Sequence, residues 1–256
     1  MALLTEAVWS LRHLTPERLV PGLAVYAVFG LLYIGVPVAA QRLGKRLKPE
    51  GAGAALILLS LALLFFLATG PVARVSIWGI ALLLLVLNAG LYWQGAACRI
   101  PALAVAGMVL SWIILGLLWA SVPLSALLIP ALAVVAGFAT LVLAANVWLQ
   151  RQTAAGSPAP PQSGVFLGLA GHAFLVAVAA NAALGIPPWP LLGVLFLLDL
   201  AAGAAALYLR RDNVHRAAMA ASGFLLIVWV DSAEVVPWPD VAVFAAGALV
   251  LFALLW

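Results

Sequence analysis

The sequence predicts an all-α fold: a polytopic transmembrane helical bundle of about nine spans, with the amino terminus outside. Hydrophobic residues make up 67% of the 256 positions, and charged residues only 8%. A chain of this length cannot cover a water-exposed surface with so few charges, so lipid is its expected solvent. The apolar residues are gathered into long runs, such as Leu82 to Leu85, that lack the alternation of a membrane barrel.

Each predicted span is a stretch long enough for a helix to cross the hydrocarbon core, which takes about 20 residues. The stretches cover residues 19–40, 52–70, 75–96, 101–121, 124–149, 164–185, 190–209, 216–231 and 239–256. Helices are expected because each closes its own backbone hydrogen bonds, which lipid cannot do. The stretch 216–231 is the weakest, because Asp231 ends its apolar run early; a re-entrant segment is the alternative there.

The chain divides into four segments. Residues 1–18 are expected to form an interfacial amphipathic segment, because their apolar side chains follow a helical spacing; a disordered tail is the alternative. Residues 19–149 form a membrane bundle of five spans, and residues 164–256 a bundle of four. Residues 150–163 hold three prolines and are predicted to be a flexible cytoplasmic linker, which is too short for a soluble catalytic domain.

The two ends of the chain lack flanking signals. The last apolar run reaches Trp256, and residues 1–14 have neither the basic start nor the cleavage site of a signal peptide. We expect the chain to be a piece of a longer polytopic protein, with a short divergent relative of one as the alternative.

The connections between spans alternate between two chemical types. After spans one, three, five and seven they are basic, and on the other side they are short and rich in proline. The residues expected to set the orientation and to meet anionic lipid headgroups are Arg42, Lys45, Arg46, Lys48, Arg210, Arg211 and Arg216. The positive-inside rule then places the amino terminus outside and the basic turns at the cytoplasm.

Intramembrane polar residues are the strongest candidate site, because an ionisable side chain in lipid is costly without a partner. Asp199 and His172 lie roughly 14 and 18 Å below the outer face at 1.5 Å per residue, and Asn88 roughly 20 Å. The spans of His172 and Asp199 are joined by a short loop, so they are expected to be neighbours. We therefore predict a midplane cluster of Asp199, His172 and Asn88.

Two interpretations of this cluster remain open. Asp199 is either a protonated, hydrogen-bonded residue that holds helices in register, or part of a site for proton-coupled transport or substrate polarity. The first is favoured, because proton relays usually involve more than one acid.

A second candidate is the acidic group Asp231, Glu234 and Asp240 around the last outer loop. Such carboxylates can bind a cation or act in acid–base chemistry, but solvated loop charge is the favoured interpretation. The chain carries no nucleotide-binding, zinc-binding or nucleophile-elbow motif, so no metal and no cofactor is expected. The net charge of +4 is spread over the turns, which excludes a nucleic-acid partner.

Several short motifs resemble a known family. They are Leu14-Thr-Pro-Glu-Arg-Leu-Val-Pro, Gly35-Val-Pro, Gly70-Pro-Val-Ala, Leu87-Asn-Ala-Gly and Val134-Val-Ala-Gly-Phe. The chain resembles a large bacterial family of multi-spanning predicted membrane proteins with a domain of unknown function. The resemblance implies a cytoplasmic (inner) membrane location and supplies no catalytic residue.

The sequence favours a non-enzymatic, multi-pass inner-membrane protein with an envelope-related or scaffold role. A proton-coupled transporter or channel-like protein that uses Asp199, His172 and Asn88 is the alternative. A membrane enzyme acting on lipid-linked substrates through Asp231 or Glu234 is the least favoured. The expected partners are the lipid bilayer and its anionic headgroups, with other membrane proteins or further copies of the chain as additional candidates.

Overall fold

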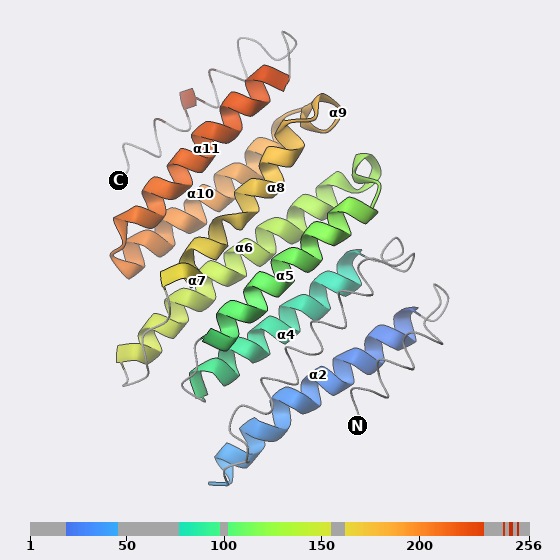
Figure 1. The fold of residues 1–256 in the computed structure, drawn as a ribbon, viewed down its shortest axis with the longest axis vertical. Coiled ribbons are helices and arrows are strands. Elements are labelled where there is room, and N and C mark those ends of the chain that lie inside the picture. Colours follow the sequence, from blue (N-terminus) through green and yellow to red (C-terminus); the bar gives the residue numbers. More distant parts are fainter. Residues whose placement is uncertain are drawn as a thin grey trace. The chain divides into compact units, whose positions relative to one another are not determined.

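The computed structural model describes residues 19–45, 77–97, 102–154 and 162–232, together with residues 243, 246, 247 and 250. Over the four continuous ranges every regular element is a helix (Figure 1). The elements are α2 (Leu19–Arg42), α4 (Ile77–Ala97), α5 (Ala102–Ser121), α6 (Leu124–Ala154), α7 (Gln162–Phe166), the 3₁₀-helix η3 (Leu167–Leu169), α8 (Ala170–Ala179), α9 (Ala182–Gly185), α10 (Trp189–Leu209) and α11 (Asp212–Ser232). The predicted all-α class is confirmed for this part of the chain.

Five of the described helices are long and apolar enough to cross a membrane. They cover Ile77–Ala96, Ala102–Ser121, Leu124–Arg151, Trp189–Leu209 and Asp212–Ser232. The last of these is one continuous helix of 21 residues, so the segment expected at 216–231 has the length of a full span. The span expected at 52–70 and the segment 1–18 lie outside the described residues, as does all of 239–256 except residues 243, 246, 247 and 250. The count of nine and the orientation stay predictions.

The described helices bury several polar side chains within an apolar core and expose large apolar side chains. Buried polar residues come from six different helices: Asn88, Gln94, Ser111, Asn146, His172, Asp199, His215 and Ser222. Meanwhile Leu82, Leu207 and Ile227 are 63%, 65% and 70% exposed. Helices that expose large apolar side chains, and place polar ones among their buried residues, fit a lipid environment rather than water.

The described helices fall into two compact units. Unit 1 includes α2, α4 and α5, and unit 2 includes α6 as far as Trp148 and every element from Val165 onward. The sequence placed the division after residue 149, whereas the contacts group most of α6 with the later helices. Helix α6 also continues to Ala154, so residues 150–154, expected in the linker, are helical. Residues 155–161 of the expected linker lie outside the described ranges.

Helix α6 is kinked near its start. Leu127 has non-helical angles (φ −120°, ψ 22°), and Pro130 follows three residues later. A proline ring clashes with the carbonyl four residues earlier, here that of Ala126, and cannot donate a hydrogen bond to it. The bend at Leu127 therefore follows from Pro130.

The segment expected to span at 164–185 is helical over most of its length, but it is interrupted twice. The 3₁₀-helix η3 separates α7 from α8, and the extended residue Asn181 (φ −123°, ψ 105°) separates α8 from α9. Asn181 caps α9, since its side-chain oxygen accepts a hydrogen bond from the Ala183 N–H. Gly168 in η3 lies so close to α6 that a Cβ there would come within 2.6 Å of Leu143.

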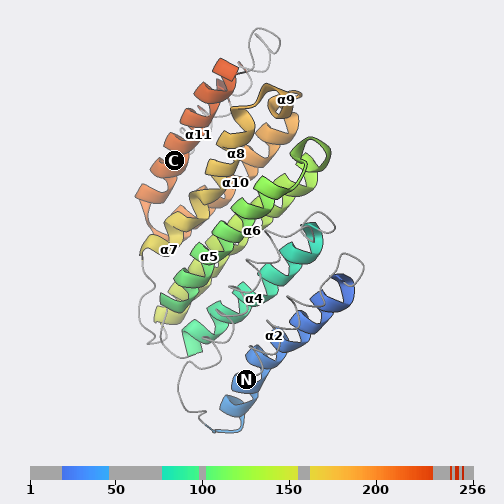
Figure 2. The ribbon, with the colours of Figure 1, turned by 45° about the vertical axis from the view of Figure 1, so that its right-hand side comes forward.

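Helices α8, α10 and α11 lie side by side in both views (Figure 1 and Figure 2). Helix α10 ends at Arg210, which has left-handed angles (φ 52°, ψ 49°), and the Arg211 N–H bonds back to the Ala206 carbonyl. This helix ending turns the chain sharply, so that α11 begins at Asp212 and runs back along α10. Small side chains line the contact, among them Ala202, Ala206 and Ala218.

Candidate functional site

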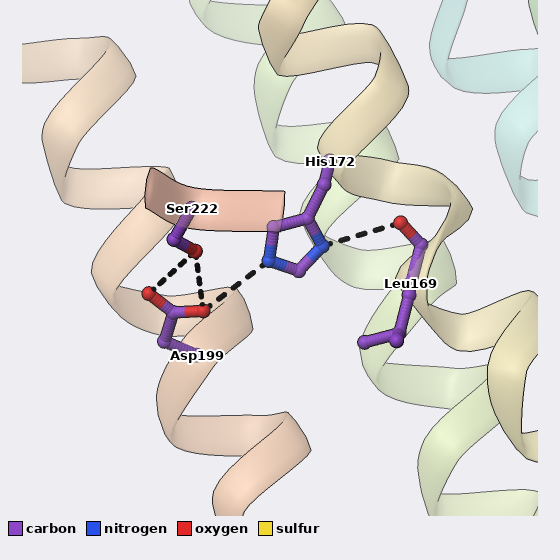
Figure 3. A network of polar contacts seen from close by, with 4 residues as sticks. All are labelled: Leu169, His172, Asp199 and Ser222. Carbon is purple, nitrogen blue, oxygen red and sulfur yellow. Dashed lines mark hydrogen bonds and ion pairs between the residues drawn. The ribbon is translucent and has the colours of Figure 1, made fainter. Parts of the chain in front are cut away.

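Three buried polar side chains meet in unit 2, each from a different helix (Figure 3). His172 of α8 approaches Asp199 of α10, with 3.2 Å between Nε2 and Oδ1. The hydroxyl of Ser222 on α11 donates to the same carboxyl group, at 2.7 Å from Oδ1 and 2.9 Å from Oδ2. We call His172, Asp199 and Ser222 the Asp199 cluster.

Two members of the Asp199 cluster, Asp199 and Ser222, lie at the middle of their helices, and His172 is the third residue of α8. Asp199 is the eleventh of the 21 residues of α10, and Ser222 the eleventh of the 21 residues of α11. At a rise of about 1.5 Å per residue, each lies roughly 15 Å from either end of its helix. His172, Asp199 and Ser222 are 2%, 2% and 0% exposed. If these helices span a membrane, the cluster is at its midplane.

The turn between α10 and α11 determines which residues meet. Asp199 lies eleven residues before Arg210, and Ser222 lies eleven residues after Arg211. Two antiparallel helices joined by a two-residue turn place such equidistant residues at the same level. The register of this hairpin therefore brings Ser222 opposite Asp199.

The second contact of His172 fixes where its ring carries a proton. Nδ1 lies 3.2 Å from the Leu169 carbonyl oxygen, at the end of η3. A carbonyl oxygen only accepts hydrogen bonds, so Nδ1 must be the N–H donor. Nε2 then faces Asp199 either as a lone pair, opposite a protonated carboxyl, or as a second N–H, opposite a carboxylate. In both forms one proton is shared between Nε2 and Oδ1, and the pair as a whole is uncharged.

This arrangement differs from a serine nucleophile with its base. Nucleophilic catalysis needs the hydroxyl hydrogen-bonded to the histidine that takes its proton. Here the Ser222 hydroxyl donates to Asp199, and His172 bonds to the same carboxyl from another helix. The cluster is therefore a carboxyl group held by two partners, and it does not activate Ser222.

The contact between His172 and Asp199 that the sequence predicted is present. The third member differs. Asn88 lies on α4 in unit 1, and its amide donates to Ser111 Oγ at 2.7 Å and to the Leu84 carbonyl at 2.8 Å. The position that the sequence assigned to Asn88 in the cluster is taken by Ser222.

The other predicted residues are either exposed, half-buried or outside the described ranges, or have no described side chain. Asp231 is exposed at the end of α11, and Glu234 and Asp240 lie outside the described residues. Among the basic residues, Lys45, Arg210 and Arg216 are exposed, and Arg211 is half-buried. Arg216 forms a wide ion pair with Asp212 at 3.9 Å, with both side chains mostly exposed. Arg42 belongs to α2, and Arg46 and Lys48 lie outside the described residues.

Two polar residues of unit 2 were missed in the sequence. Ser222 carries no charge, so the pattern of ionisable residues does not indicate it, although its distance from the Arg210–Arg211 turn does. His215 on α11 is also buried, at 5% exposure. Its Nδ1 lies 3.6 Å from the point where a Cβ on Gly203 would be.

Within the described ranges, no group of three or more histidine, cysteine, aspartate or glutamate residues is arranged to hold a metal ion. The helices and their buried polar residues define a class, an all-helical protein with the composition of a membrane protein. No protein-family model, curated protein or solved structure matches this chain. The family resemblance drawn from the sequence motifs therefore stays a prediction.

Proposed function

We propose that this chain is a non-enzymatic, multi-pass membrane protein in which the Asp199 cluster fastens α8, α10 and α11 to one another. One observation carries the proposal: the buried side chains of His172 and Ser222, from two helices, both bond to the buried Asp199 of a third. In lipid an unbonded polar group is costly, so such a cluster selects one arrangement of the helices. The proposed role is a scaffold or an envelope-related function.

The proposed location is a bacterial inner membrane, with the basic turns on the cytoplasmic side. The basis is the distribution of arginine and lysine along the sequence, which the positive-inside rule converts into an orientation. The exposed Arg210 and Arg216 at the start of α11 are suited to anionic lipid headgroups. The remaining proposed partners are other membrane proteins or further copies of the chain.

Two substitutions at Asp199 test the fastening role. Asparagine has nearly the same shape, and its amide can donate to His172 Nε2 while its oxygen accepts from Ser222. Leucine can do neither, so it leaves the Ser222 hydroxyl and His172 Nε2 buried without this partner, while His172 Nδ1 keeps its bond to the Leu169 carbonyl. We expect Asp199→Asn to unfold in lipid bicelles close to the wild-type midpoint and Asp199→Leu to unfold well below it. Equal midpoints for Asp199→Leu and the wild type would remove the fastening role.

Proton-coupled transport is the second candidate, and a separate observation favours it. The shared proton lies beside the interruption η3, whose Leu169 carbonyl bonds to His172. In transporters, substrate and ion sites lie where membrane helices are broken, and buried ionisable residues mark proton relays. The pair His172 and Asp199 would be the residues that exchange the proton.

A flux measurement separates the two candidates. Purified protein in liposomes, with a pH gradient and an internal pH dye, reports proton movement. Transport predicts flux in the wild type that Asp199→Asn abolishes while the protein stays folded. Flux equal to that of empty liposomes, or flux that survives Asp199→Asn, would reject the transport candidate and leave the fastening role intact.

A further inference from the structure

We propose that His215 is a proton relay between the α10–α11 turn and the Asp199 cluster. The inference rests on proton exchange at Asp199, the second candidate function, and goes beyond it by naming the route. It concerns a buried histidine that has no part in the fastening role.

His215 lies on the same seam as Asp199 and Ser222, where the seam is the line of contact between α10 and α11. On α11, His215 lies seven residues before Ser222, which is about two helical turns, so the two side chains share a face. On α10, Gly203 lies four residues after Asp199 and shares its face. A Cβ atom built on Gly203 would lie 3.6 Å from His215 Nδ1, so the His215 ring packs against the α10 face that carries Asp199.

His215 also lies close to the end of the hairpin. It is the fourth residue of α11, which begins at Asp212. The charged residues around this end are Arg210, Arg211, Asp212 and Arg216, and all but the half-buried Arg211 are exposed. From the turn inward, His215 is therefore the first buried titratable group on α11, and Asp199 lies further along the seam.

The chemistry of the ring suits a relay. An imidazole can take a proton at one nitrogen and release one from the other, so it passes a proton on without a lasting change of charge. Between His215 and Ser222 the α11 face carries Ala218 and Met219, and the α10 side offers Ala202 and Gly203. Three of these four residues are small and the methionine side chain is unbranched and flexible, so the relay would use a transient water molecule that enters between them.

The test is the rate at which the Asp199 carboxyl group exchanges its proton for deuterium in lipid. Infrared difference spectra detect the C=O stretch of a protonated carboxylic acid, and its loss in Asp199→Asn assigns the band. We expect the wild-type band to shift soon after transfer to D₂O. His215→Phe should slow this shift by roughly 100-fold, the low end of what a positioned proton-transfer group contributes.

A second variant protects the test against misfolding of His215→Phe. Gly203→Ala introduces a methyl group that meets only His215 Nδ1 within 4 Å, so it fits without moving the backbone. This methyl group covers the ring on the side of the seam and should also slow the exchange. Asn213→Ala, at an exposed residue of the same turn, should exchange like the wild type.

Three results would overturn the relay. One is wild-type exchange speed in both His215→Phe and Gly203→Ala. Another is a wild-type band that exchanges only when the protein unfolds, and the third is the absence of a protonated carboxyl band. The fastening role is judged separately from the unfolding midpoints, so its failure and the failure of the relay are distinguishable.

Discussion

The Ser222 hydroxyl lies within hydrogen-bond distance of both carboxyl oxygens of Asp199, at 2.7 and 2.9 Å, and each residue is the central one of its 21-residue helix. The bond joins two antiparallel helices at the level farthest from either end. There the hydrogen bond has no competition from water if the hairpin spans a membrane. The α10–α11 hairpin is therefore held both at its turn and at its centre.

Ser222→Ala should lower the free energy of unfolding by about 1 kcal/mol, within the range of interhelical hydrogen bonds measured in membrane proteins. The alanine keeps the helix and leaves one acceptor position of Asp199 empty. Unfolding in mixed micelles measures the change. Thr140→Val is a matched control, because Thr140 is exposed and its hydroxyl bonds to the Ala136 carbonyl of its own helix. Equal losses in the two variants would contradict the interhelical bond.

Gly168→Ala should destabilise unit 2 by about 1 to 3 kcal/mol, the usual cost of overpacking a tight contact. A Cβ at Gly168 would lie 2.6 Å from Leu143 Cδ2 and 2.7 Å from its Cγ. Gly193→Ala on α10 is the control, since nothing lies within 4 Å of the Cβ position there. The measurement is the midpoint of thermal unfolding of each variant in detergent, which should be lower for Gly168→Ala than for Gly193→Ala. A Gly168→Ala midpoint at or above that of Gly193→Ala is the contrary result.

In unit 1 we expect an energetic coupling between Asn88 and Ser111. The Asn88 amide donates to Ser111 Oγ at 2.7 Å, and Ser111 donates to the Gly107 carbonyl at 2.8 Å. A double-mutant cycle of Asn88→Leu and Ser111→Ala should give a coupling free energy of about 0.6 kcal/mol, typical of buried membrane pairs. Strictly additive effects would mean that this bond does not stabilise α4 against α5.

Labelling of single cysteines should find Ala183 and Asn213 on opposite sides of the membrane. Both residues are exposed, and α10 runs between α9 and the turn that precedes α11. In a Cys98→Ser background, Ala183→Cys should react with a membrane-impermeant maleimide in intact cells. Asn213→Cys should react only after the cells are opened. Labelling of both from one side would rule out α10 as a span.

Much of unit 2 could be predicted from the sequence, because hydropathy and loop length are local properties. The contact of His172 with Asp199 followed from their similar depth on spans joined by a short loop. The breaks at η3 and Asn181 did not follow, since the residues between 164 and 185 are apolar enough for an unbroken helix. What decides them is packing against α6 and the cap formed by Asn181, and neither appears in a hydropathy pattern.

The partner that Ser222 provides for Asp199 could not be predicted from the hydropathy pattern either. Depth along a helix does not identify its neighbour, so Asn88 was grouped with residues of the other unit. The sequence does not indicate Ser222 for a second reason. The expected span 216–231 begins four residues later than α11 does, so the equal distances of Asp199 and Ser222 from the Arg210–Arg211 turn are not apparent. A helix boundary at Asp212 would have brought the two residues to one level.

The most direct test of the Asp199 cluster is the ¹⁵N NMR spectrum of the His172 ring in lipid, assigned with His215→Asn and His172→Asn variants. We expect Nδ1 to carry a proton, Nε2 to have the shift of a nitrogen that shares a proton, and Asp199→Leu to change only the second signal strongly. A ring with bare Nδ1, or a spectrum that Asp199→Leu leaves unchanged, would contradict the cluster.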